Sequence, residues 1–150
     1  MGKFTVETTI ARQPDEVFAY MSNYENELEW QAGHVIEVVP EPAGPIRQGT
    51  RIHKVRKTPN GELRFTMEVT SVDKAARSWE ELTTSSMLTG SINRWQVLAE
   101  GNGSRVRLNA TFRAKGLGKL LLPLITRSAE KGMHAEFANL KHILEGEPEA

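Results

Sequence analysis

The chain has 150 residues, and its 19 basic and 19 acidic side chains give a formal net charge of zero. A balanced charge gives no reason to expect the basic surface that nucleic acids or anionic membranes require. The absence of cysteine excludes disulfides, thiol nucleophiles and thiolate metal sites. A chain of this length forms one domain with a sizeable core, so we expect a single domain over residues 1–150.

The first thirty residues predict a strand followed by two short helices. Residues 4–10 alternate in the manner of a strand. Gln13-Pro-Asp-Glu is typical of a helix start, because proline suits the first helical position and acidic residues complement the helix dipole. A second short helix is expected to run through residues 27–30, after a cap at Ser22 or Asn23.

From residue 35 to residue 112 the hydrophobic period is two, which predicts an antiparallel sheet. The expected strands are residues 35–39, 50–57, 63–69, 77–84, 91–99 and 106–112. The prolines and glycine of residues 40–45 predict a break after the first of these strands. Thr58-Pro-Asn-Gly and Gly101-Asn-Gly predict tight turns, and hairpin-length turns join antiparallel neighbours.

Residues 119–145 predict one long helix, in which apolar residues recur every three or four positions. This stripe consists of Leu122, Ile125, Ala129, Met133, Phe137, Leu140 and Leu144. Pro123 falls near the first turn, where proline is tolerated, and Gly146 and Pro148 end the helix. The element order predicts an α+β domain, in which a curved antiparallel sheet of about six to seven strands buries the helix stripe.

The start of the chain and its apolar segments predict where the protein is found. The first ten residues contain no apolar segment of the signal-peptide kind. The longest apolar cluster, residues 120–125, is far shorter than the roughly 20 residues of a membrane span. We therefore expect a cytoplasmic protein without stable membrane insertion.

Two parts of the chain resemble a known superfamily. Residues 6–30, with Pro14-Asp-Glu-Val-Phe-Ala-Tyr-Met and Trp30, resemble the opening of START-like (SRPBCC) proteins of the polyketide cyclase/dehydrase and lipid-transport type. Asn93-Arg-Trp-Gln-Val, the Gly103-Ser-Arg-Val-Arg-Leu strand and the helix that follows are similar to its last third. The resemblance implies a helix-grip fold with a cavity between sheet and C-terminal helix. Because this superfamily includes carriers, receptors and aromatase/cyclases, the fold alone does not determine the function.

The mixture of large and small side chains agrees with such a cavity. Small residues on the helix, such as Ser128, Gly132 and Ala135, leave room beside large aromatic ones, and apolar walls with a few polar groups are typical of ligand sites. The alternative is that these side chains pack together as a core. The residues expected to bind a ligand are Trp30, His53, Phe65, Met67, Trp79, Trp95, Ser128 and Met133.

His53 and Glu136 are candidates for acid–base chemistry. His53 is in phase with Val55, so it faces the cavity if Val55 does, and histidine is the residue type most often used as a general acid or base. Glu136 lies beside the helix stripe, where burial would raise the pKa of a carboxyl group. The alternatives are a wall or surface position for His53, and for Glu136 a place at the solvent boundary or a partner such as Arg94. Glu81 is a weaker candidate of the same kind.

No pair of histidines has metal-ligand spacing, so we expect neither a metal nor a cofactor.

Three hypotheses about function follow. The first hypothesis is a carrier or sensor, monomeric or homodimeric, that binds a small hydrophobic or aromatic ligand of lipid or polyketide type in the cavity. The second is a cyclase/dehydrase-like enzyme in which His53 and Glu136 move protons. The third is a subunit or chaperone-like protein that uses the concave surface for protein contacts.

Overall fold

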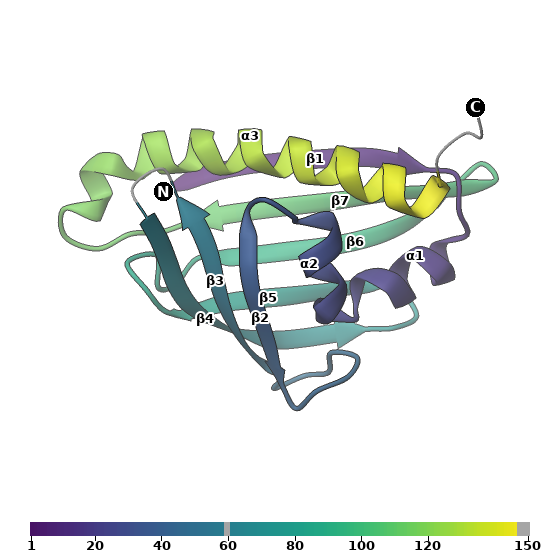
Figure 1. Ribbon diagram of the computed structural model, residues 1–150, viewed down its shortest axis with the longest axis horizontal. Coiled ribbons are helices and arrows are strands. Elements are labelled where there is room, and N and C mark those ends of the chain that lie inside the picture. The colour runs from purple at the N-terminus through teal and green to yellow at the C-terminus, as the bar shows by residue number, and fades with distance from the viewer. Residues whose placement is uncertain (59–60, 147–150) are drawn as a thin grey trace.

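The computed structural model describes residues 1–58 and 61–146, and these contain one antiparallel sheet and four helices (Figure 1). Pro59 and Asn60 of the predicted turn, and Pro148, lie outside the described residues. The strands are β1 (Gly2–Ile10), β2 (Val35–Glu41), β3 (Arg51–Thr58), β4 (Gly61–Asp73), β5 (Ser78–Ser85), β6 (Ile92–Glu100) and β7 (Gly103–Phe112). The helices are α1 (Pro14–Met21), η1 (Tyr24–Asn26), α2 (Glu27–Trp30) and α3 (Gly118–Glu145).

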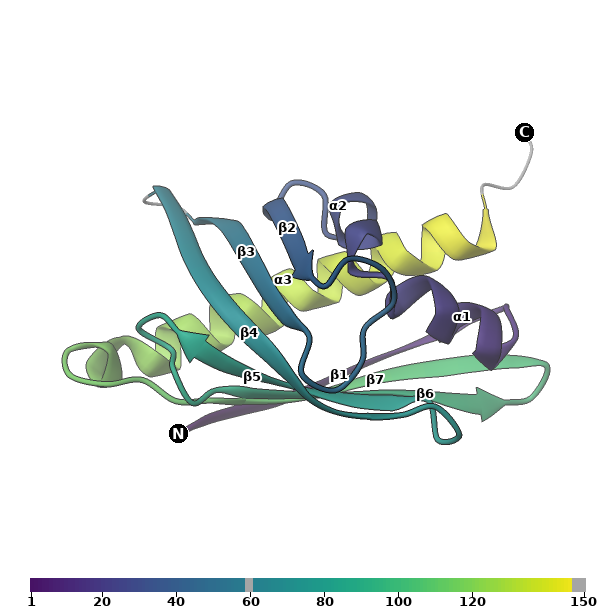
Figure 2. The same cartoon turned by 90° about the horizontal axis from the view of Figure 1, so that it is seen from below.

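The sheet bends around α3, which confirms the α+β helix-grip prediction. Its strand order is β1-β7-β6-β5-β4-β3-β2. β2, β3 and the start of β4 turn up out of the plane of the other strands (Figure 2). The pairing of β4 with β5 shifts register between Thr66 and Met67 and again between Val69 and Ser71, and such bulges increase bend and twist. One side of α3 packs on β1, and the bend brings β3 to another side of the same helix.

The predicted periodicities have the expected consequences for burial. Val106, Leu108 and Ala110 of β7 are buried, and the residues between them are half-buried or exposed. On α3, Leu122, Met133, Phe137 and Leu140 are buried, so the predicted stripe is the face that packs on the sheet. Within the described residues, no helix is long and apolar enough to cross a membrane.

The predicted break after residue 39 begins too early, because β2 continues through Pro40 to Glu41. Proline cannot donate to the hydrogen-bond ladder of a central strand. β2 is the last strand in the order, so one side of it has no neighbouring strand in the described sheet. An edge strand tolerates proline for this reason, and the break begins only after Glu41.

Aromatic side chains fill the space between the sheet and the second half of α3. Trp79 and Trp95 are directly opposite each other on β5 and β6, and their rings stack at 5.8 Å with an interplanar angle of 7°. Trp30 meets Trp95 edge-on at 6.0 Å, and Phe137 of α3 lies 6.0 Å from the same ring. These four side chains, called the aromatic cluster below, are at most 4% exposed. This part of the grip is therefore a packed core.

Candidate functional site

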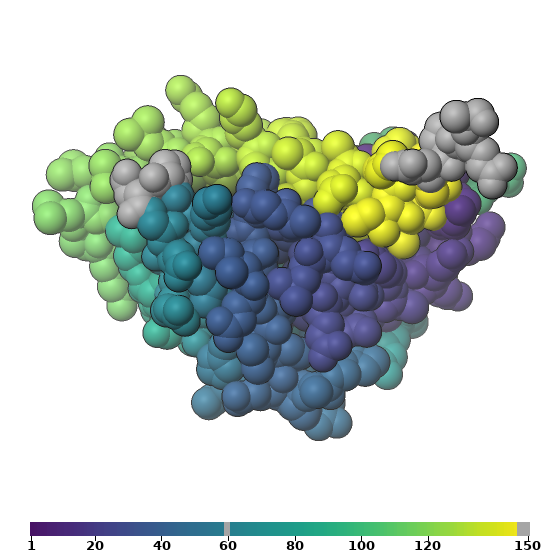
Figure 3. Space-filling view, viewed as in Figure 1, coloured from purple at the N-terminus to yellow at the C-terminus, as the bar shows by residue number. Residues whose placement is uncertain are grey.

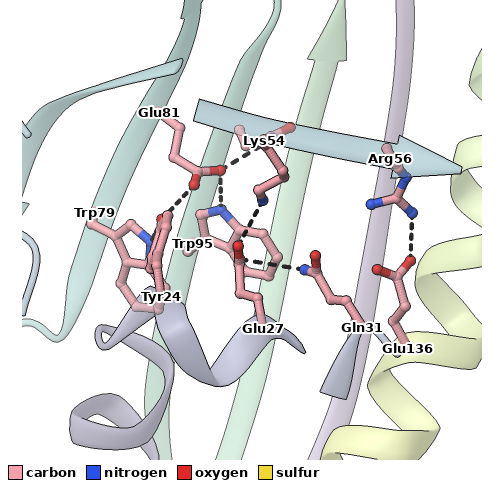
Figure 4. A network of polar contacts seen from close by, with 10 residues as sticks. Tyr24, Glu27, Gln31, Lys54, Arg56, Trp79, Glu81, Trp95 and Glu136 are labelled. Atoms are coloured by element: carbon pink, nitrogen blue, oxygen red, sulfur yellow. Dashed lines mark hydrogen bonds and ion pairs between the residues drawn. The ribbon is translucent and has the colours of Figure 1, made fainter. Parts of the chain in front are cut away.

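A charged cluster joins α3 to β3 across the open side of the grip. The carboxylate of Glu136 is 1% exposed and accepts a hydrogen bond of 2.7 Å from Arg56 Nη2 (Figure 4). His34, in the loop before β2, places its Nδ1 3.3 Å from the same carboxylate oxygen. The side chains of Arg56 and His34 are 24% and 39% exposed, so the cluster connects a buried carboxylate to solvent.

Gly132 leaves this cluster uncovered on the helix side. A Cβ atom at this position would lie 3.7 Å from Glu136 Oε2, 3.8 Å from Arg56 Nη2 and 3.8 Å from His34 Cε1. These are ordinary contact distances, so a larger side chain would press on all three residues. The glycine thus leaves room for other atoms beside the cluster.

An open groove with a volume of about 670 Å³ lies next to the cluster. Its lining includes Gly33 and Val35, which flank His34, and Lys57, which follows Arg56. The backbone NH of Lys57 donates a hydrogen bond of 2.7 Å to the carbonyl of His34, which joins the two sides of the groove. The groove thus lies at the β2–β3 end of the grip and is lined by the sequence neighbours of His34 and Arg56.

A second ionic contact, between Glu27 of α2 and Lys54 of β3, is almost completely buried. Lys54 Nζ lies 2.7 Å from Glu27 Oε1, and the two side chains are 5% and 3% exposed. Gln31 Nε2 donates a hydrogen bond of 3.4 Å to the other carboxylate oxygen. Burial raises the pKa of Glu27 to about 7, although the Lys54 charge acts in the opposite direction. This carboxyl group therefore exchanges its proton near neutral pH.

Glu81 is the centre of a hydrogen-bond network beside Trp79 and Trp95 (Figure 4). Its carboxylate accepts hydrogen bonds from Trp95 Nε1 at 2.7 Å, from Asn93 Nδ2 at 3.2 Å and from the Tyr24 hydroxyl. Tyr24 in turn accepts a hydrogen bond of 2.8 Å from Trp79 Nε1. Burial, together with the charge of Glu81, raises the pKa of Tyr24 well above its ordinary value. Tyr24 therefore stays protonated and holds Glu81 in place.

Several buried polar atoms of this interior have no hydrogen-bond partner among the described residues. They include Glu136 Oε1, Gln31 Oε1 and Trp30 Nε1, from side chains that are at most 2% exposed. Most buried polar atoms in proteins are paired, so each such atom calls for a physical explanation. Together with the three buried carboxylates they give the interior a polar stripe from β5 to α3.

The proposed acid–base pair of His53 and Glu136 does not converge in the structure. His53 lies on the outer face of β3, where its ring contacts Thr66 at 3.1 Å and Glu41 at 3.4 Å. Its side chain is 44% exposed. The inward positions of β3 are those of Lys54 and Arg56, whose partners come from the helices. The structure therefore does not bring the His53 and Glu136 side chains together, and a catalytic role for either residue stays a prediction.

The other predicted ligand-binding residues fall into two groups. Ser128 is exposed on the outer side of α3, where it cannot line the grip. Phe65 and Met67 are on the inner face of β4, opposite Lys54 and Ile52 of β3. Trp30, Trp79, Trp95 and Met133 are buried inside, and a contact between any of these inward residues and a ligand stays a prediction.

The sequence alone did not predict Glu27, His34, Lys54 or Arg56 as site residues. Ile52, Lys54 and Arg56 share one face of β3, and His53 lies on the other face. Assigning the Ile52 face to the interior would have pointed to Lys54 and Arg56. Glu27 and His34 come from a short helix and a loop, whose approach to β3 has no periodic signal. Within the described residues, no group of three or more histidine and acidic side chains is arranged to hold a metal ion.

Comparisons with known proteins agree with the fold. No curated protein sequence matches the chain. The structure is similar to TTHA0849 from Thermus thermophilus, with a TM-score of 0.79 and 20% identity over 95% of this chain and 96% of that one. The KanY protein follows with a TM-score of 0.77 and 20% identity over 97% of this chain and 100% of that one.

A third similar structure is the di-domain ARO/CYC BexL from the BE-7585A biosynthetic pathway. Its TM-score is 0.73 and its identity 21%, over 95% of this chain and 46% of that one. At these identities the similarity concerns the fold alone. Residues 1–145 match the family described as polyketide cyclase/dehydrase and lipid transport. The chain therefore belongs to this family, as the START-like resemblance implied.

Proposed function

We propose that the protein binds a small molecule with an apolar or aromatic body and a polar group, such as a hydroxyl or carbonyl, and acts as its carrier or sensor. The molecule enters by the groove at the β2–β3 end of the grip. Its polar group contacts Arg56, His34 and Glu136, and its body lies between α3 and the inner face of β3 and β4. Lipid-like and polyketide-like molecules combine these two features.

The observation that carries the proposal is the Arg56–Glu136–His34 cluster with the room left by Gly132. Burial removes the hydration of a carboxylate, and the ion pair that replaces this hydration adds little to the stability of the fold. Here the carboxylate also has an unpartnered oxygen, and the cluster adjoins an open groove. Both features suit a group that exchanges partners when a ligand binds.

A side chain added at Gly132 tests the proposal, with 1-anilinonaphthalene-8-sulfonate as the probe, because it has an aromatic body and a polar group. Titration of the wild-type protein should give a saturable rise in probe fluorescence. Gly132→Leu should abolish the saturable part, because leucine would fill the space beside the cluster. The matched control is Ser128→Leu, which adds the same side chain one turn away on the exposed face of α3.

Two results would contradict the proposal. One is saturable binding that is equally tight in wild type and Gly132→Leu. The other is the absence of saturable binding in the wild-type protein. Far-ultraviolet circular dichroism and thermal melting of both variants show whether the fold is retained. Replacement of a helical glycine is favourable for the helix itself by about 1 kcal/mol, so loss of binding through unfolding is not expected.

The raised pKa of Glu27 favours a second candidate, a cyclase/dehydrase-like enzyme. A carboxylate with a pKa of about 7 is suited to remove a proton at neutral pH, and Lys54 lies within 2.7 Å to stabilise developing negative charge. A linear poly-β-ketone surrogate would be followed by the ultraviolet absorbance of aromatic products. The enzyme proposal requires a rate above that in buffer, lost in Glu27→Gln; equal rates with and without protein would exclude it for this substrate class.

A further inference from the structure

The first two turns of α3 and the loop before them expose an apolar surface that points away from the sheet. Leu117, Leu120, Leu121 and Leu124 are 81%, 79%, 49% and 66% exposed. Leu122 and Thr126, on the opposite side of the same helix, are buried. In Figure 3 this part of α3 forms one end of the molecule, with nothing covering it in that view. We call these four leucines the leucine face.

Exposure of this kind has no explanation in the fold. Four exposed leucines within residues 117–124 form a contiguous apolar surface, whereas isolated exposed leucines are common. The side of α3 that packs on β1 is complete without them, because Leu122, Met133, Phe137 and Leu140 supply it. The leucine face is therefore available to a partner.

The charge around the leucine face indicates what kind of partner fits. Residues 113–127 contain Arg113, Lys115, Lys119 and Arg127 and no acidic residue, although the whole chain is neutral. All four cations are exposed, and among the described residues none is in an ion pair. The balanced composition thus conceals a local concentration of positive charge beside exposed leucines.

We propose that the leucine face docks on the surface of an anionic lipid bilayer. A helix with apolar side chains flanked by cations lies in the membrane interface, where the leucines enter the acyl boundary and the cations meet anionic headgroups. A second copy of the chain would bring four cations against four like charges, which disfavours self-association through this face. The proposal goes beyond ligand binding, and neither depends on the other.

Cosedimentation with lipid vesicles tests the proposal on the full chain. Vesicles of phosphatidylcholine and phosphatidylglycerol in equal parts should bind the wild-type protein, and binding should weaken as salt rises. Vesicles of phosphatidylcholine alone should bind at least roughly tenfold more weakly, because each cation near an anionic surface raises the binding constant by about fivefold. The double variant Leu120→Ser/Leu124→Ser should bind the anionic vesicles at least roughly tenfold more weakly than wild type.

The control variant is Leu28→Ser, which replaces a 44% exposed leucine on α2 and should leave vesicle binding unchanged. Because all three leucines are exposed, circular dichroism and melting should be close to wild type. The proposal is overturned if wild type does not sediment with anionic vesicles, or if the double variant binds as well as wild type. It is also overturned if the leucines instead control a monomer–dimer equilibrium in sedimentation velocity while vesicles are not bound.

Discussion

Titration of Glu27 should make the protein less stable as the pH rises from 5 to 8. Its carboxyl group binds a proton more tightly in the folded chain, where burial raises the pKa from 4.5 to about 7. The folded state therefore binds more protons than the unfolded state between these values, and stability falls with rising pH across this window. The difference corresponds to about 3 kcal/mol of unfolding free energy.

The perturbation that isolates this effect is Glu27→Gln, which removes the titrating group and keeps its shape. Urea unfolding of wild type and variant at pH 5 and pH 8 gives the change in unfolding free energy for each protein. The comparison uses this change, because the variant also leaves Lys54 buried without its carboxylate partner. We expect the variant to lose about 3 kcal/mol less than wild type between the two pH values.

The matched control is Glu37→Gln, which removes an exposed acid of β2 and should reproduce the wild-type pH dependence. Groups that do not interact with Glu27 contribute equally to all three proteins and cancel in the comparison. If wild type and Glu27→Gln lose the same free energy between pH 5 and pH 8, Glu27 does not titrate in this window. The reasoning that assigns it a proton near neutrality would then be refuted.

Three further predictions concern side-chain packing and are read from urea unfolding. Phe137→Ala should lower the unfolding free energy by about 3–5 kcal/mol, because it removes the one buried ring that α3 contributes to the aromatic cluster. Trp95→Phe should lower it by about 1–3 kcal/mol, because Glu81 loses the donor at 2.7 Å. Gly103→Ala should lower it by about 1–3 kcal/mol, because the new Cβ would lie 2.6 Å from the carbonyl oxygen of Ile10. A loss below about 0.5 kcal/mol, typical of surface substitutions, would contradict each of them.

Much of the fold could be predicted because its periodicities are local. Alternation over residues 63–69 and 106–112 and the stripe from Leu122 to Leu144 predicted β4, β7 and α3. Two strand ends that differed from the prediction depend on the sheet as a whole. β2 extends through Pro40 because it is an edge strand, and β4 continues to Asp73 because its bulges carry it around the bend.

The candidate site was harder to predict, because it depends on which side chains meet in three dimensions. Lysine and arginine are seldom buried, so nothing in the pattern of β3 marked Lys54 and Arg56 as inward residues. Lys54 and Arg56 face inward instead because Glu27 and Glu136 meet them there. Those partners lie far away in the sequence, on two different helices. Glu136 was singled out correctly as a buried carboxylate near the helix stripe, but its partner is Arg56 and not Arg94.

The central claim is that a ligand enters between α3 and β3 at the Arg56–Glu136–His34 cluster. It is tested most directly by nuclear magnetic resonance, in which the backbone amide shifts are followed during titration with 1-anilinonaphthalene-8-sulfonate. The largest shifts should occur at His34, Arg56 and Gly132, and they should disappear in Gly132→Leu. Shifts confined to Leu120 and its neighbours on the outer side of α3, or no saturable shifts at all, would contradict it.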